Sequence, residues 1–371
     1  MVIRHGRILP GHNRVDTQKK GLLARLFPQR RVQERMLREL RDEMSREHKN
    51  VIRELREMRR TAEQSQKRID SALAAHEEAL STLPELQARV DRSLTAYAHD
   101  AKSAARLSDF RSTLDRQAVL SHVTRAVERA RLEMLPCPHL VVDNVFPDEV
   151  YDRLVESLPA PVFFEKTNDL RDEMPVPFTV APAYSRAVWD LFHEAVEGAL
   201  LPSVIAKFRP ALDEFVRATW PSLGSWEQSG ITLRAANPRL MLRRRGYLIK
   251  PHRDPRWAFL VALFYAAPRG TGHTYGTQLY RLIQERDEAH TSPLWLAPGE
   301  CELARDVPGI GNSALMFLNS TGAHGASVPD DAPPDFLRYV YQARFSPDTA
   351  TKTRLLELLA GEGRERWVAT R

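Results

Sequence analysis

The sequence predicts an α+β protein in which a long helical coiled-coil region precedes a domain of short strands with flanking helices. Residues 1–135 hold only 3 of the 25 prolines, 3 of the 17 glycines and 3 of the 29 aromatic residues. Residues 136–371 hold all the others, and from Ile231 onwards short apolar segments alternate with turn residues. Many short strands with Gly and Pro connections are typical of a sandwich or barrel of the jelly-roll or cupin type. A single uniform globule is therefore excluded.

The composition divides the chain into four regions. We expect a disordered basic tail over 1–21, a helical coiled-coil region over 22–135, a strand-rich domain over 136–350, and a C-terminal helix and tail over 351–371. The stretch from Leu22 to Leu135 has no glycine and is rich in Arg, Glu, Leu and Ala, which favours helix.

A seven-residue repeat within the helical region predicts a coiled coil. Ten of the fourteen positions in its two seams are apolar, which is typical of helices that pair along an apolar stripe. We therefore expect a homo-oligomer assembled through these helices. The first seam consists of Leu37, Met44, Val51, Met58, Ser65, Ala72 and Ala79, and the second consists of Arg41, His48, Leu55, Ala62, Ile69, His76 and Leu83.

Two interruptions are expected in this helical region. Thr82-Leu83-Pro84-Glu85 has the form of a capping box that restarts the helix, either as a kink or as the turn of a hairpin. A further helix is expected over Phe110–Met134, with apolar residues on one side.

Charge and composition exclude several classes of protein. Residues 1–70 carry 19 Lys and Arg against 10 Asp and Glu, but the two signs are interleaved and Phe27 is the one aromatic residue there. This pattern favours a solvated coiled-coil face over a nucleic-acid surface, which needs stacking aromatics. The longest apolar run, Trp257–Ala267, has eleven residues, too few to span a bilayer. Two distant cysteines, Cys137 and Cys301, argue against a disulfide framework, and we expect a cytoplasmic protein.

The second half of the chain predicts helices followed by strands. A β-branched run, Leu140–Val142, precedes a helix opened by Pro147, and turn residues dominate 162–183. Further helices are expected over 185–201, 203–219 and 350–360, and strands over 239–244, 247–252, 257–266, 276–283, 313–318, 323–328 and 337–346.

The chemistry-bearing residues cluster in this strand-rich half. His252-x-Asp254 lies in a strand-like context, where side chains two apart point to the same face. With 12 histidines and 21 aspartates in 371 residues, one such match is expected by chance, and His76-x-Glu78 is a similar pattern in the helical region. Two further residues make the His252-x-Asp254 match informative. His324 follows a later apolar strand, and Arg338 opens another. Two histidines and a carboxylate with open positions suit a non-haem iron, and a buried guanidinium suits a carboxylate ligand.

These residues, in this order, resemble the Fe(II)- and 2-oxoglutarate-dependent dioxygenases, double-stranded β-helix enzymes that include the prolyl hydroxylases. The resemblance runs from about Pro138 to Pro347 and includes Gly246-Tyr247, His252-x-Asp254, Gly276-Thr277, His324 and Arg338. It implies that 136–350 is the dioxygenase domain. It also implies that O₂ and 2-oxoglutarate are converted, with hydroxylation of a substrate, to succinate and CO₂.

The resemblance also implies roles for individual residues. His252, Asp254 and His324 would bind Fe(II) and carry catalysis, and Arg338 would receive the distal carboxylate of 2-oxoglutarate. Tyr247 resembles a tyrosine that several members place beside the cosubstrate. Many members carry a hydroxyl two residues after the arginine, where this chain has Val340. We expect either that Tyr247, Ser327 or Thr277 supplies that contact or that the contact is missing.

Three alternatives stay open. Arg344, six residues after Arg338 on the same expected strand, is a rival for the cosubstrate arginine, and Arg338 could instead pair with Asp331 or Asp335. The chain could also be a coiled-coil scaffold whose strand domain binds without catalysis. The substrate, a small molecule or a protein side chain, would contact loops within 162–183, 267–276 and 284–298.

Overall fold

A computed structural model describes residues 28–268, 275–283, 293–359 and 361–368 of the chain. The expected basic tail, and parts of the expected substrate loops within 267–276 and 284–298, lie outside these residues. The chain divides into two units, residues 1–86 and 87–371. Among the described residues, no helix is long and apolar enough to cross a membrane.

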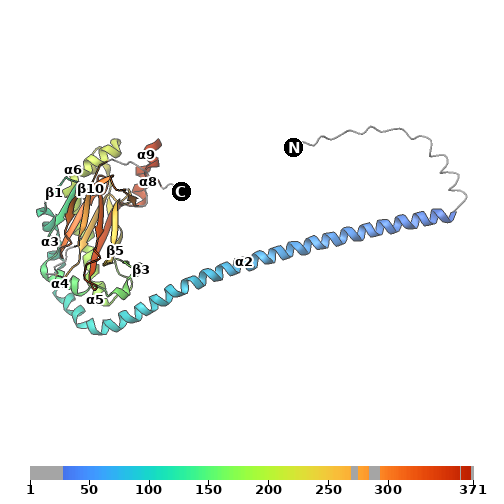
Figure 1. The fold of residues 1–371 in the computed structure, drawn as a ribbon, viewed down its shortest axis with the longest axis horizontal. Helices are drawn as coiled ribbons and strands as arrows, with labels where there is room; N and C mark the ends of the chain where they lie inside the picture. Colours follow the sequence, from blue (N-terminus) through green and yellow to red (C-terminus); the bar gives the residue numbers. More distant parts are fainter. Residues whose placement is uncertain (1–27, 269–274, 284–292, 360, 369–371) are drawn as a thin grey trace. The chain divides into compact units, whose positions relative to one another are not determined.

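The long N-terminal helix expected from the composition is present. Helix α2 (Pro28–Thr113) has 86 residues and continues through Pro84 without reversing (Figure 1). The hairpin turn, one of the two forms expected for Thr82–Glu85, is therefore absent. A proline inside a helix removes one backbone donor and costs about 3 kcal/mol, which the many strong helix formers on both sides offset here.

The helix expected over Phe110–Met134 has different bounds. The chain leaves α2 after Thr113, and Asp115 begins a new helix by accepting a hydrogen bond from the Ala118 N–H at 3.0 Å. This helix, α3 (Arg116–Arg129), ends five residues early because the chain turns to form strand β1 (Leu132–Glu133). An Asp at the N-cap is a strong local start signal, and it outweighs the continuous apolar pattern.

The other helices follow in chain order. The described helices after α3 are α4 (Asp148–Glu156), α5 (Ala183–Ala195), the π-helix η2 (Val196–Leu200), α6 (Leu201–Thr219), α7 (Trp226–Ser229), α8 (Thr349–Glu357) and α9 (Gly361–Glu365), with short 3-10 helices η1 (Pro161–Phe163) and η3 (Pro221–Leu223). The two helices expected over 185–201 and 203–219 form one continuous run, because η2 joins α5 to α6 without a break.

The strands form two antiparallel sheets. The larger sheet has the order β1-β2-β11-β7-β13-β5-β4-β3, and the smaller has the order β10-β8-β12-β6-β9. After β1, the strands are β2 (His139–Val142), β3 (Glu165–Asn168), β4 (Arg171–Pro175), β5 (Leu233–Arg244), β6 (Leu248–Arg253), β7 (Leu260–Tyr265), β8 (Thr277–Leu282), β9 (Leu294–Trp295), β10 (Cys301–Val307), β11 (Ser313–Leu318), β12 (Ala323–Ser327) and β13 (Leu337–Pro347).

Alternation along the central strands separates two apolar layers. On β7, Leu260, Ala262 and Phe264 belong to the cluster shared with the helices, whereas Val261, Leu263 and Tyr265 belong to a second cluster. The second cluster also contains Leu279 of β8, in the smaller sheet. The central strands are therefore buried on both faces, which explains their unbroken apolar runs.

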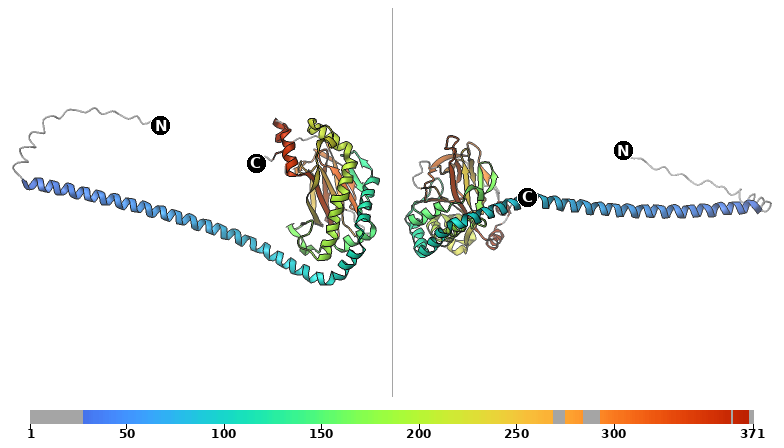
Figure 2. Two further views of the ribbon diagram at one scale, coloured as in Figure 1. Left: turned by 180° about the vertical axis from the view of Figure 1, so that it is seen from behind. Right: turned by 90° about the horizontal axis from the view of Figure 1, so that it is seen from below.

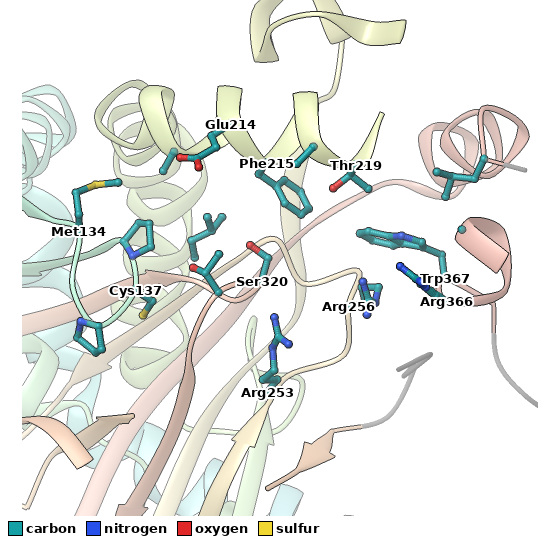
Figure 3. Close-up of a pocket in the computed structure, with 18 residues that line it drawn as sticks. Met134, Cys137, Glu214, Phe215, Thr219, Arg253, Arg256, Ser320, Arg366 and Trp367 are labelled. Atoms are coloured by element: carbon teal, nitrogen blue, oxygen red, sulfur yellow. The ribbon is translucent and has the colours of Figure 1, made fainter. Parts of the chain in front are cut away.

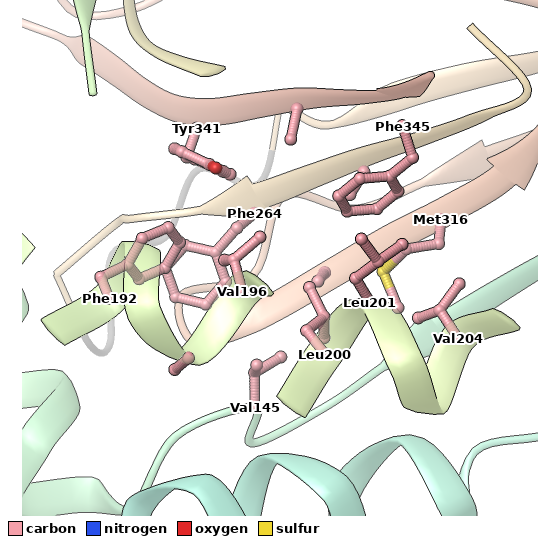
Figure 4. Packing of buried hydrophobic residues seen from close by; sticks show 14 of the residues in the cluster. Val145, Phe192, Val196, Leu200, Leu201, Val204, Phe264, Met316, Tyr341 and Phe345 are labelled. Carbon is pink, nitrogen blue, oxygen red and sulfur yellow. The ribbon is translucent and has the colours of Figure 1, made fainter. Parts of the chain in front are cut away.

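Helices cover the outer face of the larger sheet. In Figures 1 and 2, α3, α5 and α6 lie along one side of the strands. Figure 4 shows Phe192, Val196 and Leu200 from this helical layer packed against the strands. The ring of Phe192 lies 5.0 Å from that of Phe264 and 4.7 Å from that of Tyr341, measured between centroids. This packing fixes the larger sheet and leaves its inner face for the site.

Five of the described strands were absent from the expected set: the two-residue strands β1 and β9, and the charged strands β3, β4 and β10. Strands β3 and β4 form a hairpin within 162–183, which was expected to consist of turns, and β10 lies at the edge of the smaller sheet. The sequences of β3, β4 and β10 are rich in charged residues, and strands at or next to the edge of a sheet need no apolar alternation because they are less covered by the core.

We expect Phe192→Ala to lower the free energy of unfolding by about 3–5 kcal/mol, because a large buried ring leaves a cavity between helix and sheet. Leu303→Ala is the matched control, since this side chain is 53% exposed on β10, and it is expected to change stability by less than about 0.5 kcal/mol. Urea denaturation of both variants measures the difference. Equal effects of the two substitutions would contradict the packing described.

Candidate metal centre and adjoining cavity

Pairing between β6 and β12 brings two histidines together. His252 lies directly opposite His324 in the antiparallel register, and their ring centroids are 4.2 Å apart. The Nδ1 atom of His252 lies 2.9 Å from the carbonyl oxygen of Lys250. Because a carbonyl can only accept, Nδ1 carries the proton and Nε2 keeps its lone pair.

Asp254 follows directly after β6 and is held by three contacts. Its Oδ1 accepts a hydrogen bond from Nη2 of Arg344 at 2.6 Å. Its backbone N–H donates to Oδ1 of Asn319 at 2.9 Å, and the Asn319 amide donates back to the Asp254 carbonyl at 2.9 Å. The carboxylate is therefore fixed in place, and its Oδ2 lies 3.8 Å from Nε2 of His324.

The three side chains are almost completely buried, and burial sets their protonation. Burial lowers the pKa of His324 to about 3 and lowers that of His252 as well. Burial opposes ionisation of Asp254, but His324 and the Arg344 guanidinium outweigh it and hold the pKa of the carboxyl below its usual value. At neutral pH the cluster has two neutral imidazoles and one carboxylate, the state that a cation requires.

The donor set fits a divalent metal. One ligand atom from each of His252, Asp254 and His324 lies within 4.8 Å of the others. Within the described part of the chain, Oδ2 of Asp254 and Nδ1 of His324 are buried and have no hydrogen-bond partner. A buried carboxylate oxygen without a partner is costly, and a cation at this point would satisfy it. Two imidazoles and one carboxylate are the ligands of mononuclear non-haem iron sites.

Arg338 lies at the start of β13, beside the segment that leads into β8. Its Nε donates to the Tyr275 carbonyl at 2.7 Å, and its Nη2 donates to the Gly276 carbonyl at 2.7 Å. Nη2 also lies 3.5 Å from the hydroxyl of Thr277, which accepts a hydrogen bond from the Tyr265 hydroxyl at 2.9 Å. Among the described residues no carboxylate pairs with Arg338, so the alternative pairing with Asp331 or Asp335 is not found.

Gly276 is required at this close approach. A Cβ built on Gly276 would lie 1.7 Å from the carbonyl oxygen of Val307, so no larger residue fits without a backbone shift.

Burial lowers the pKa of Arg338, and the nearby phenols of Tyr265 and Tyr247 oppose this shift. An arginine held by neutral carbonyls stays charged and keeps a donor for an anion.

Tyr247 lies between two further arginines. The guanidinium carbons of Arg171 and Arg243 lie 5.3 Å and 5.2 Å from the centroid of its ring. Tyr247 and Thr277 both line the cavity described next, whereas Ser327 is not among the described residues that line it.

A cavity of about 190 Å³ joins the histidines to Arg338. His252, His324 and Arg338 line it, and so do Tyr247 and Thr277. The two histidines of the cluster, the expected cosubstrate arginine and its expected neighbours therefore line one small cavity, while Asp254 lies next to the histidines without lining it. Arg344 lines the same cavity, but its guanidinium contacts Asp254.

The described residues also surround a larger cavity, of about 600 Å³ (Figure 3). Arg253 faces it, together with Phe215, Ser320 and Trp367. Because neighbours along a strand point to opposite sides, Arg253 enters this cavity while His252 enters the smaller one. The larger cavity contains none of the three clustered ligands, so size alone does not identify the site.

Solved structures of prolyl hydroxylases and other 2-oxoglutarate-Fe(II) oxygenases match the chain at low similarity. A prolyl 4-hydroxylase from Phytophthora capsici is 14% identical, with 64% of this chain and 68% of that chain covered and a TM-score of 0.31. The epimerase SnoN from nogalamycin biosynthesis, in complex with Fe3+ and alpha ketoglutarate, is 14% identical, with 63% and 86% covered and a TM-score of 0.34.

HygX from Streptomyces hygroscopicus, with nickel, 2-oxoglutarate and hygromycin B bound, is 12% identical, with 57% and 83% covered and a TM-score of 0.35. No protein-family model and no curated protein sequence matches the chain. Since these TM-scores are below 0.5, the function has to be inferred from the geometry of the residues themselves.

The sequence did not indicate every residue of the site. Asn319 precedes His324 by five residues and could have been noticed as a polar residue ending a buried strand. The contact of Arg344 with Asp254 joins residues 90 apart, and no local pattern predicts it.

We expect Arg344→Gln to weaken the binding of Mn(II), a probe for the metal, by about 10- to 100-fold, because the Asp254 carboxylate loses its orienting partner. His252→Ala should abolish measurable binding. His76→Ala is the matched control, since His76 belongs to the similar His-x-Glu pattern on the exposed surface of α2. Isothermal titration of each variant gives the affinities, and wild-type binding by His252→Ala would contradict the assignment.

Proposed function

We propose that the chain is an Fe(II)- and 2-oxoglutarate-dependent oxygenase that hydroxylates a substrate and releases succinate and CO₂. The observation that carries the proposal is the buried His252–Asp254–His324 cluster, whose two histidines line a small cavity together with Arg338, an arginine that has no carboxylate partner among the described residues. Iron, when bound, supplies the activation of O₂, coupled to oxidative decarboxylation of 2-oxoglutarate.

The topology agrees with a double-stranded β-helix for the proposed domain, 136–350. Strands β5, β7, β11 and β13 lie in the larger sheet, and β6, β8, β10 and β12 lie in the smaller one. The chain thus passes repeatedly between two facing sheets, and β6 and β12 carry the histidines between them. A cytoplasmic location stays a prediction.

In this proposal, separate residues bind the metal and orient its carboxylate ligand. His252, Asp254 and His324 hold the metal on one side and leave other positions for ligands. Asn319 and Arg344 orient Asp254, which keeps Oδ2 directed at the cluster. Burial of the cluster excludes water and keeps both imidazoles neutral.

We assign the distal carboxylate of 2-oxoglutarate to Arg338 and not to Arg344. Arg344 already contacts the carboxylate of Asp254, whereas the partners of Arg338 are two neutral carbonyls and, at 3.5 Å, the Thr277 hydroxyl. In this proposal Thr277 and Tyr247 contact the same carboxylate.

The direct test is succinate formation from 2-oxoglutarate with Fe(II) and O₂. We expect the wild-type chain to form succinate slowly without substrate and His252→Ala to form none above background. His76→Ala should match the wild type. A His252→Ala variant that turned over 2-oxoglutarate as fast as the wild type would contradict the proposal. The alternative, a scaffold that binds without catalysis, predicts no metal-dependent succinate from any variant.

Replacing Arg338 separates the cosubstrate site from the metal site. We expect Arg338→Gln to raise the KM for 2-oxoglutarate about 10- to 100-fold, since a charge-assisted hydrogen bond contributes about 1.5–3 kcal/mol. Mn(II) affinity should stay unchanged. Arg338→Lys keeps the charge and should give an intermediate KM. If Arg344→Gln instead raised the KM and left Mn(II) affinity intact, the two arginines would exchange roles.

We also propose that α2 pairs with a second copy of this chain. The large apolar residues of its two seams that the structure describes are each more than half exposed, and so are several neighbours such as Leu73 and Leu86. An exposed apolar stripe of this length on one helix is unstable alone and is stabilised when two heptad seams pack together. Self-pairing is favoured because the same seam is available on every copy.

We expect Leu55→Ser with Ile69→Ser to convert the oligomer into a monomer, because two seam residues become polar. Arg53→Ser with Lys67→Ser is the matched control, since these residues lie on the opposite side of the heptad. Sedimentation equilibrium of the full chain measures the mass. A monomeric wild type, or an oligomer that tolerates the seam change, would contradict self-pairing.

A further inference from the structure

Three arginines stand side by side across three neighbouring strands. Arg171 of β4 pairs in register with Arg243 of β5, and Arg243 pairs with Arg338 of β13. All three line the cavity of the metal cluster, together with Arg239 and Arg344. Like charges directly opposite in a sheet are destabilising, so this row needs a compensating anion.

The described residues supply few such anions. Glu173 is shared, with its Oε2 2.8 Å from Arg239 and its Oε1 2.7 Å from Arg243. The carboxylate of Asp254 pairs with the guanidinium of Arg344. Five arginines of the cavity thus face two carboxylates, a formal excess of three positive charges. The bound metal and 2-oxoglutarate would carry opposite charges of equal size, so they leave this excess unchanged.

The arginines differ in how far they are engaged. Arg338 is assigned to 2-oxoglutarate, Arg344 to Asp254, and Arg243 is buried among Glu173 and the carbonyls of Asp172 and Leu242. Arg171 and Arg239 stay partly exposed to the cavity, although Arg239 also pairs with Glu173. The one described polar contact of Arg171 is a hydrogen bond of 3.3 Å to the Leu248 carbonyl.

Arg239 is held rigidly in place. Its Nε and Nη2 both donate to the side-chain oxygen of Gln342, at 3.1 Å and 2.8 Å. Burial lowers the pKa of Arg239, Glu173 raises it, and the nearby Arg344 and Arg243 guanidiniums lower it further. The mutual repulsion of these groups is relieved when an anion binds among them.

We propose that Arg171 and Arg239 form an anion-binding subsite of this cavity, which takes the carboxylate or phosphate group of an acidic small-molecule substrate. That the bound acid group belongs to a substrate rests on the proposed function. The anion-binding subsite itself rests on the arginines alone. Arginine suits this role because its planar fork matches the oxygens of both acid groups.

The test measures anion binding and needs no turnover. The chain is saturated with Mn(II) and 2-oxoglutarate, so that Arg338 is engaged, and its thermal midpoint is followed as sulfate, a stand-in for phosphate, or acetate is added. Sulfate stabilises most proteins without specific binding, so the readout is the difference between variants. Arg171→Gln with Arg239→Gln is compared with Arg209→Gln with Arg281→Gln, which removes the same charge from exposed ion pairs with Glu227 and Glu302.

We expect the control variant to keep the anion-dependent rise of the wild type and the cavity variant to lose it. A larger rise with sulfate would identify a phosphate group, and a larger rise with acetate would identify a carboxylate. Equal responses of the two double variants would overturn the subsite. If Mn(II) and 2-oxoglutarate themselves caused no shift, the oxygenase proposal would fail. The same comparison on the metal-free chain would then decide the subsite by itself.

Discussion

The antiparallel pairing of His252 with His324 is the constraint on which the site depends. Two imidazoles from strands far apart in the sequence meet because β6 and β12 are neighbours in the smaller sheet. The chain then needs one carboxylate within reach, and Asp254 supplies it just after β6. A slip of one residue in this register would turn His252 away from the cavity and bring Arg253 into it.

Burial of this cluster makes the charge of Asp254 unfavourable unless neighbouring groups compensate it. An ionised Asp254 inside the protein would be unfavourable alone, and Arg344 and Asn319 compensate it. The inner face of the larger sheet continues this positive character through Arg243, Arg239 and Arg171. The helical layer packs apolar side chains around Phe192 against the opposite face, so the site and the main hydrophobic core lie on different sides of the same strands.

The sequence predicted the parts of the fold and site that depend on local pattern. The absence of glycine predicted the long helix, and the apolar runs around Phe264 and Met316 predicted the central strands. The order of His252, Asp254, His324 and Arg338 predicted the residues that the cavity brings together. Each of these signals is carried by residue type and by spacing over a few positions.

The remainder depends on contacts between distant segments. The row of Arg171, Arg243 and Arg338 exists only through the register of three strands, and β4 lies within 162–183, where turn residues predicted turns. The contact of Arg344 with Asp254 likewise joins β13 of the larger sheet to the residue that follows β6 of the smaller sheet. The continuous helix through Pro84 shows that a strong local break signal can be outweighed by the long helix on both sides.

In the proposed function, a metal and Arg338 bind opposite ends of one 2-oxoglutarate molecule. Titration of 2-oxoglutarate into the full chain under anaerobic conditions, with and without Fe(II), measures whether the two ends are coupled. We expect Fe(II) to raise the affinity for 2-oxoglutarate at least about tenfold, and Asp254→Ala to remove this gain. An affinity that is the same with and without the metal would contradict this coupling.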